Sequence, residues 1–228
     1  MTYLRGIKSY VLRQGRLTDA QAHALEHYWS HYGIDYRAET INLDAVFGRR
    51  APRILDIGSG MGETLIELAR RHPENDYIAV EVHRPGVGSL IKSAASLGLT
   101  NVRVINHDVI DVLTHQLPDA CLDETYIFFA DPWPKKRHHK RRLVNENFLS
   151  LLKPKLKPHA RLFLATDWAD LAEHLLSVCD QDGDLNNIAG RGNFTPRPVW
   201  RPLTKFEKRG LKLEHGVWDL CYCLRSEE

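Results

Sequence analysis

RILDIGSGMGETL, residues 53–65, joins a short apolar run to a glycine-rich turn and to the start of an amphipathic segment. The run at 53–57 has the length and apolar content of a buried strand. Glycines at 58, 60 and 62 allow a tight turn and a close approach of the backbone to a ligand. The following segment, 64–71, has apolar residues at helical spacing. This strand–turn–helix unit predicts an α/β fold whose first strand ends at a ligand site.

The same alternation of strand and helix patterns continues along most of the chain. Continuous apolar strands separated by helices are typical of a parallel sheet that is covered on both faces. We therefore expect a Rossmann-like, doubly wound α/β fold with a mostly parallel sheet, in which the closing run at 218–225 adds an antiparallel C-terminal strand. The predicted strands are 53–57, 77–81, 102–106, 125–131 and 161–166, and the predicted helices are 64–71, 87–98, 109–117, 143–152 and 171–179.

Residues 1–50 contain no strand pattern, and we expect them to form an N-terminal arm with short helices packed on the core at 51–228. No linker or repeat divides the chain, which predicts a single domain over residues 1–228. No apolar run approaches the ~18 residues that a membrane span needs, and the N-terminus lacks a signal-peptide core. These features predict a cytoplasmic protein with no membrane partner.

The charge of the chain is unevenly distributed. The octet KKRHHKRR at 135–142 (the basic octet) contains six Lys and Arg residues, and without them the chain has 25 basic and 29 acidic side chains. Two further basic blocks lie at 1–16 and 191–212. One such block alone is most simply a solvated basic loop. Three blocks on a mildly acidic body favour a nucleic-acid partner.

The cysteines and histidines give no sign of a metal site. Cys121, Cys179, Cys221 and Cys223 fit no CxxC spacing, so we expect inert, reduced thiols. The histidines are scattered, and no Cys or carboxylate lies at metal-ligand spacing from the His pair in the basic octet. We expect no metal cofactor.

Acidic residues accompany the first three predicted strands. Asp56 lies in the first, Glu81 ends the second, and Asp108 follows the third. Glu63 stands where the dinucleotide fingerprint requires its last glycine, and an acid there would repel a pyrophosphate. The pattern favours a nucleoside ligand with an ammonium group, such as S-adenosylmethionine. Glu81 would accept hydrogen bonds from the ribose, and Asp108 from the adenine amino group, although Asp108 also suits a helix N-cap.

The fourth predicted strand delivers one carboxylate into a proline-rich turn. Phe129 and Ala130 lead to Asp131, and Pro132-Trp133-Pro134 then runs directly into the basic octet. An apolar strand that ends this way is typical of a presented functional group. Trp133 would stack on a base or fill the core. The octet places phosphate-seeking charge beside the predicted reaction centre.

Five segments together resemble the bacterial tRNA (guanine-N7)-methyltransferase family, a family of class I S-adenosylmethionine-dependent methyltransferases. The resemblance spans about residues 50–212, and its most selective parts are DPWPKKRHHKRR and TKFEKRG. It implies methyl transfer from S-adenosylmethionine to N7 of guanosine 46 in the variable loop of tRNA, with no obligatory protein partner evident. The five segments are DIGSGMGETL (56–65), IAVEVHRPGVGSL (78–90), FFADPWPKKRHHKRRL (128–143), LATDWADLAEHLL (164–176) and RPLTKFEKRG (201–210).

The resemblance also implies roles for individual residues. Asp131 is the implied catalytic carboxylate and contacts the cofactor as well. The implied cofactor-binding residues are Asp56, Gly58, Gly60, Glu81, Asp108 and Asp131; the implied substrate-binding residues are Lys135, Asp167, Thr204, Lys205, Phe206 and Glu207; and the implied RNA-binding residues are Arg137, His138, His139, Lys140, Arg141 and Arg142.

Two other functions remain open at this point. An exocyclic-amine (adenine-N6) nucleic-acid methyltransferase presents (D/N)PP(Y/F/W) after its fourth strand, whereas residues 131–134 read DPWP. A non-catalytic RNA-binding subunit on the same fold would not need Asp56, Glu81, Asp108 and Asp131 together. Nucleoside analysis of a methylated RNA would separate all three functions.

Overall fold

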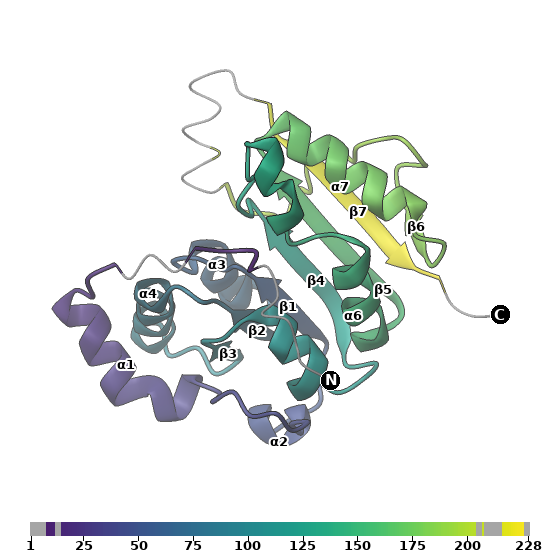
Figure 1. The fold of residues 1–228 in the computed structure, drawn as a ribbon. Coiled ribbons are helices and arrows are strands. Elements are labelled where there is room, and N and C mark those ends of the chain that lie inside the picture. The colour runs from purple at the N-terminus through teal and green to yellow at the C-terminus, as the bar shows by residue number, and fades with distance from the viewer. Residues whose placement is uncertain (1–7, 12–14, 204–206, 208–215, 226–228) are drawn as a thin grey trace.

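The computed structural model describes residues 8–11, 15–203, 207 and 216–225, and its centre is a seven-stranded sheet (Figure 1). The strand order is β3-β2-β1-β4-β5-β7-β6. Neighbouring strands from β3 to β5 pair in parallel, whereas β7 is antiparallel to both β5 and β6. The strands are β1 (Arg53–Ile57), β2 (Asp76–Val80), β3 (Val102–Ile105), β4 (Leu122–Phe128), β5 (Leu156–Thr166), β6 (Leu185–Asn187) and β7 (Trp218–Leu224).

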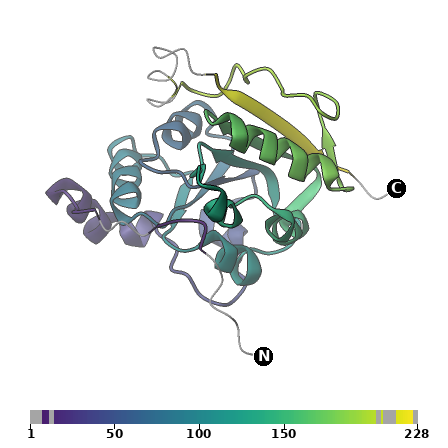
Figure 2. The same cartoon turned by 45° about the horizontal axis from the view of Figure 1, so that its top comes forward.

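Helices cover both faces of this sheet, which confirms the predicted doubly wound fold (Figure 2). Helices α1, α3 and α4 pack on one face, and α5, α6 and α7 pack on the other. The helices are α1 (Asp19–Tyr32), α2 (Leu43–Phe47), α3 (Glu63–Arg71), α4 (Arg84–Ser96), α5 (Val109–Asp111), α6 (Glu146–Leu152) and α7 (Ala169–Gln181), with a π-helical turn η1 (Val112–Gln116) and 3₁₀ turns η2 (Lys136–Arg141) and η3 (Lys153–Lys155).

The central strands are apolar on both faces because both faces are covered. In β1, Ile54 packs into the core under α3 and α4, while Leu55 packs into the core under α6 and α7. Both side chains are almost completely buried. This double burial is the physical reason why the strand reads as a continuous apolar run rather than as an alternating one.

Several predicted boundaries differ from the structure. Strand β4 begins at Leu122 and ends at Phe128, so the last three residues of the predicted strand 125–131 belong to the following turn. The short edge strand β6 was not predicted, because its three residues, LNN, carry no apolar pattern. The predicted helix at 109–117 is one turn of α-helix that continues as a π-helical turn. The N-terminal segment includes the 14-residue helix α1, which is longer than the short helices expected.

A buried ion pair fastens the start of β2 to the segment before β1. Asp76 is completely buried, and the guanidinium of Arg49 donates to its Oδ1 from Nε at 2.9 Å and from Nη2 at 2.7 Å. Arg49 also donates to the carbonyl of Pro73. The neighbouring Arg50 is 92% exposed and pairs only with the half-exposed Asp44 among the described residues.

We predict that Arg49→Gln lowers the free energy of unfolding by about 2–3 kcal/mol, because it leaves the Asp76 carboxylate buried without its cation. Arg50→Gln is the matched control and should change stability by less than about 1 kcal/mol, as exposed pairs do. Urea denaturation of the two variants measures both values. Equal effects of the two substitutions would contradict this account of Asp76.

Candidate functional site

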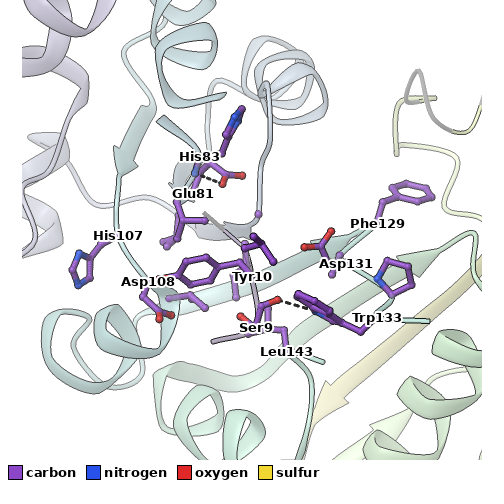
Figure 3. A pocket seen from close by; sticks show the side chains of 18 of the residues that line it. Ser9, Tyr10, Glu81, His83, His107, Asp108, Phe129, Asp131, Trp133 and Leu143 are labelled. Atoms are coloured by element: carbon purple, nitrogen blue, oxygen red, sulfur yellow. Dashed lines mark hydrogen bonds between the residues drawn. The ribbon is translucent and has the colours of Figure 1, made fainter. Parts of the chain in front are cut away.

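A cavity of about 560 Å³ opens at the carboxyl ends of the parallel strands (Figure 3). Its volume lies within the range of ordinary small-molecule sites. Residues after β1, β2, β3 and β4 line it, among them Gly58, Glu81, Asp108 and Asp131. Strand order reverses at β1, which lies between β2 and β4. This reversal point is where open α/β sheets bind their ligands.

Glu81 organises the first side of the cavity. Its Oε2 accepts a hydrogen bond from the backbone N–H of Gly60 at 2.8 Å, and its Oε1 accepts one from the N–H of His83 at 2.7 Å. The carboxylate therefore ties the glycine turn after β1 to the start of α4. Each oxygen keeps a second lone pair for a ligand.

The glycine turn is open toward the cavity and closed toward the protein. Gly58 and Gly60 have φ angles of +75° and +56°, and a Cβ at either residue would meet nothing within 4 Å. A Cβ on Gly86 in α4, by contrast, would lie 2.3 Å from the carbonyl oxygen of Gly60. The turn can approach α4 this closely only because residue 86 has no side chain.

Asp56 is buried beneath this turn and is not among the residues that line the cavity. It is 5% exposed, and in the sheet it pairs with Ala79 on one side and Tyr126 on the other. No described residue donates a hydrogen bond to its carboxylate. Burial, and secondarily the negative charge of Glu81, raise the pKa of Asp56 to about 7.

Asp108 has both of the roles that carboxylates take at strand ends. Its Oδ1 caps α5 by accepting from the N–H of Ile110 at 3.1 Å. Its Oδ2 accepts from the ammonium of Lys8 at 2.5 Å, although the two residues are 100 positions apart. This hydrogen bond raises the pKa of Lys8. Lys8, which the sequence placed in a basic block, is therefore paired with a buried carboxylate, although its own side chain remains half exposed.

Asp131 lies on a strained turn between β4 and the basic octet. Phe129 and Trp133, on either side of it, have φ angles of +57° and +48°. Non-glycine residues adopt this left-handed conformation at a cost of order 1–3 kcal/mol, and such residues cluster at functional sites. The turn leaves Asp131 exposed at the rim of the cavity, with no hydrogen-bond partner among the described residues.

The basic octet divides into inward-facing and outward-facing residues. Arg142 is 3% exposed; it donates to the carbonyl of Pro132 at 3.2 Å and forms an ion pair with Asp170. The Arg142 guanidinium is thus engaged inside the protein in this structure, and its contact with RNA stays a prediction. Arg141 is partly buried and donates to backbone carbonyls of residues 8 and 10.

The remaining members of the octet are more accessible. Lys135, Lys136, Arg137 and Lys140 are exposed. His138 and His139 are partly buried; the ring of His138 packs edge-on to Trp133, and His139 lies 3.6 Å from Asp170. Burial, together with the surrounding positive charges, lowers the pKa of His138. The outward-facing charge thus comes mainly from four lysine and arginine side chains.

Of the predicted substrate residues, Thr204, Lys205 and Phe206 lie outside the described residues. Asp167, directly after β5, is exposed. Glu207 is 1% exposed and accepts from Arg201 at 2.8 Å and Arg197 at 3.3 Å. Arg201 is completely buried and also makes two hydrogen bonds to Asp219 in β7, at 3.0 and 3.1 Å. Glu207 therefore lies in an internal ion network, and two arginines of the third basic block are used there.

Comparison with known proteins places this arrangement in a family. A family model described as "Putative methyltransferase" matches residues 50–220. A tRNA (guanine-N(7)-)-methyltransferase from Nitrosospira multiformis is 53% identical over 218 residues, which cover 96% of this chain and 94% of the relative. The chain belongs to the tRNA (guanine-N(7)-)-methyltransferase family. A second member, from Hydrogenovibrio crunogenus, is 50% identical, with 96% of this chain and 91% of the relative covered.

Solved structures support the fold of this family member independently. A 30S ribosomal methyltransferase from an uncultured bacterium has a TM-score of 0.54 and 12% identity, with 80% of this chain and 92% of that chain covered. At this identity the likeness concerns the fold alone. It agrees with the predicted Rossmann-like class I methyltransferase fold.

Among the described residues, no helix combines the length and the apolar character that a membrane span requires. The same part of the chain contains no group of three or more His, Cys, Asp and Glu side chains arranged to hold a metal ion.

Sequence reasoning missed one wall of the cavity in this methyltransferase-family chain. Ser9, Tyr10 and Val11 line it together with the strand ends. The only sequence signal there was the basic block at 1–16, which suggested an RNA contact. No local pattern links these residues to a cavity whose other walls lie at least 40 positions away.

We predict that Asp56→Asn stabilises the ligand-free protein increasingly as the pH rises from 5 to 7. The raised pKa means that folded Asp56 holds a proton which the unfolded chain loses above its ordinary pKa of 3.8. Wild-type stability should therefore fall from the ordinary pKa up to about pH 7, by an amount on the order of a few kcal/mol, and level off above it because Asp56 is then ionised in both states. The Tm difference between variant and wild type at several pH values measures it, and a constant difference would contradict the assignment.

Proposed function

We propose that this protein transfers the methyl group of S-adenosylmethionine to N7 of guanosine in tRNA, at position 46 of the variable loop. One observation carries the proposal: the exposed Asp131 carboxylate lies at the rim of a ligand-sized cavity and is followed directly by the outward-facing lysines and arginines of the basic octet. A nucleoside cofactor and an RNA backbone would meet at this point. The names of the relatives describe the methylation of guanine N7 in tRNA.

The residues of the cavity fit S-adenosylmethionine. The open glycine turn at Gly58 and Gly60 leaves space for a ligand against the backbone. Glu81 has a free lone pair on each oxygen for ribose hydroxyls. Asp108, and Asp56 once ionised, would add negative charge toward the adenine amino group and the cofactor's ammonium group. An acid, Glu63, begins α3, so the helix start does not favour phosphates.

The substrate side would be formed by residues from several elements. Lys135 and Asp167 are exposed and follow β4 and β5, and would contact the guanosine and its surroundings. Thr204, Lys205 and Phe206 complete the strip implied by the family resemblance. Glu207 would help to position this strip. It forms ion pairs with Arg197 and Arg201, and Arg201 in turn pairs with Asp219 in β7. The outward-facing residues of the octet would bind phosphates.

The chemistry requires alignment more than proton transfer. When bound, S-adenosylmethionine supplies an electrophilic methyl group on a positively charged sulfur. Guanine N7 offers a free lone pair, so no base is needed: the N7–carbon bond forms, the carbon–sulfur bond breaks, and the positive charge passes to the guanine. Asp131 would orient the guanine and stabilise the positive charge that develops on it. The strained turn holds this carboxylate at the cavity rim.

Incubation with tRNA and labelled S-adenosylmethionine, followed by nucleoside analysis, tests the proposed function. The expected product is 7-methylguanosine. N6-methyladenosine alone would support the adenine-N6 methyltransferase instead, and binding of tRNA without any methylation would support a non-catalytic RNA-binding subunit.

We predict that Asp131→Asn lowers the single-turnover methylation rate by about 10²-fold or more, the loss expected when one preorganised electrostatic contact is removed. The variant keeps the size of the side chain, so folding and tRNA binding should be preserved. The pH dependence of the wild-type rate should show no step from the titration of a carboxylate that acts as a base, because guanine N7 carries no proton to remove. A near-wild-type rate at saturating cofactor and tRNA would remove Asp131 from the catalytic role.

We also predict that replacing Lys135, Arg137 and Lys140 together by Gln flattens the salt dependence of tRNA binding. Each lost phosphate contact should reduce the log–log slope by roughly 0.7–0.9. The control replaces Arg50, Arg70 and Arg71, which carry the same charge but precede β1 or end α3, at the opposite edge of the sheet. Equal slopes for the two triple variants would mean that the octet is a solvated surface.

The proposal includes the setting in which the protein acts. We infer that it works in the cytoplasm, where its tRNA substrate is found, as one methyltransferase domain without an obligatory protein partner or metal.

A further inference from the structure

The segment Lys8–Val11 lies along the cavity, although the other residues that line the cavity are distant from it in the sequence. Ser9, Tyr10 and Val11 are lining residues, and Figure 3 shows Tyr10 between Asp108 on one side and Trp133 on the other. The segment therefore spans the space from the carboxyl end of β3 to the turn after β4. Neither the catalytic carboxylate nor the predicted cofactor residues belong to it.

One side chain from the turn after β4 and one from η2 hold the backbone of this segment. The indole Nε1 of Trp133 donates to the carbonyl of Ser9 at 2.9 Å. Arg141 donates from Nε to the carbonyl of Lys8 at 2.9 Å and from Nη2 to the carbonyl of Tyr10 at 2.8 Å. The Arg141 guanidinium also lies 4.0 Å from the centre of the Trp133 ring. Three consecutive carbonyls are thus bound by two side chains that stack on each other.

On its other side, the segment is bound to Asp108, the residue that is expected to face the adenine of the cofactor. The ammonium of Lys8 is 2.5 Å from Asp108 Oδ2. Burial and the nearby Asp108 carboxylate raise the pKa of the Tyr10 hydroxyl. Lys8 and Tyr10 are therefore both close to the one carboxylate that was expected to face adenine.

The volume of the cavity shows what this segment does there. About 560 Å³ is present with Ser9, Tyr10 and Val11 already in place, which is a normal size for a pocket that encloses a small ligand. The segment therefore forms one wall of the pocket and leaves space for a ligand beside it.

We propose that Lys8–Val11 is a strap that encloses the bound cofactor, and that Arg141 and Trp133 are the positioning residues that hold this strap over the pocket. The inference rests on the proposed function for the identity of the cofactor. It gives Arg141 a role in the cofactor pocket, in place of the phosphate contact that the basic octet suggested.

The test measures the binding and release of S-adenosylhomocysteine by the full-length protein, by calorimetry and by displacement kinetics. Arg141→Gln removes two hydrogen bonds to the strap and should raise both Kd and the release rate by about tenfold. Tyr10→Ala should also raise Kd and the release rate. Tyr10→Phe should keep the slow release of wild type, because the aromatic ring forms the wall of the pocket. Lys136→Gln is the matched control, since it removes one exposed charge from the same 3₁₀ turn and should leave release unchanged.

A second measurement needs no ligand. Trypsin cleaves after Lys8, and cleavage requires the Lys8 carbonyl, which is bound by Arg141 Nε. Arg141→Gln should therefore be cut at this bond faster than wild type or Lys136→Gln, while its Tm stays within about 2–4 °C of wild type, as for a loss of about 1 kcal/mol. Faster cleavage without a general loss of stability separates a freed strap from a loosened fold.

The outcomes distinguish the strap from the proposed function. If wild type binds no S-adenosylhomocysteine, the methyltransferase proposal fails. If wild type binds it, and Arg141→Gln and Tyr10→Ala release it at the wild-type rate, only the strap is overturned. Tighter binding by these two variants would also overturn it, because the segment would then compete with the cofactor.

Discussion

The parallel pairing of β1 with both β2 and β4 is the constraint on which the site depends. It brings the carboxyl ends of these strands to one edge of the sheet, although paired residues are 23 positions apart between β1 and β2 and 70 positions apart between β1 and β4. The glycine turn, Glu81 and Asp131 then border a single cavity. Glu81 reinforces the arrangement, since its carboxylate joins the turn after β1 to the start of α4. Without this pairing the acidic residues would be separate helix caps and surface charges.

Many of the basic residues in this protein stabilise its own structure. Arg142 bonds to Asp170, Arg201 joins Glu207 and Asp219, and Lys8 pairs with Asp108. Asp170, Asp219 and Asp108 are each at least 18 positions from the basic residue with which they pair, and such charge-assisted hydrogen bonds are stronger than neutral ones. Among the described residues of the three blocks, the outward charge is therefore smaller than the composition suggests. The accessible residues Lys135, Lys136, Arg137 and Lys140 follow the turn at the cavity rim, where an RNA chain would need positive charge.

The turn after β4 connects the two halves of the proposed site. Its strained backbone presents Asp131 toward the cavity, and its Trp133 holds the proposed strap together with Arg141 of η2. The exposed lysines and Arg137 that follow this turn face solvent. Cofactor enclosure and RNA binding would thus involve neighbouring residues of one short segment. Neighbouring residues can serve these two purposes because the prolines and the left-handed residues fix the direction in which each side chain leaves the turn.

The sequence alone determined the fold class and which acidic residues lie at the strand ends, because these depend on local patterns. β1 was predicted at its observed bounds, and the strand-end positions of Glu81 and Asp108 followed from short apolar runs and the turn chemistry after them. Only the tertiary structure decided which charges face outward. Arg137 and Arg142 lie in the same octet, yet one is exposed and the other is buried against α7, since burial depends on contacts that no local spacing encodes. The contribution of Ser9, Tyr10 and Val11 to the cavity was likewise invisible, because long-range hydrogen bonds to backbone carbonyls leave no pattern in side-chain identity.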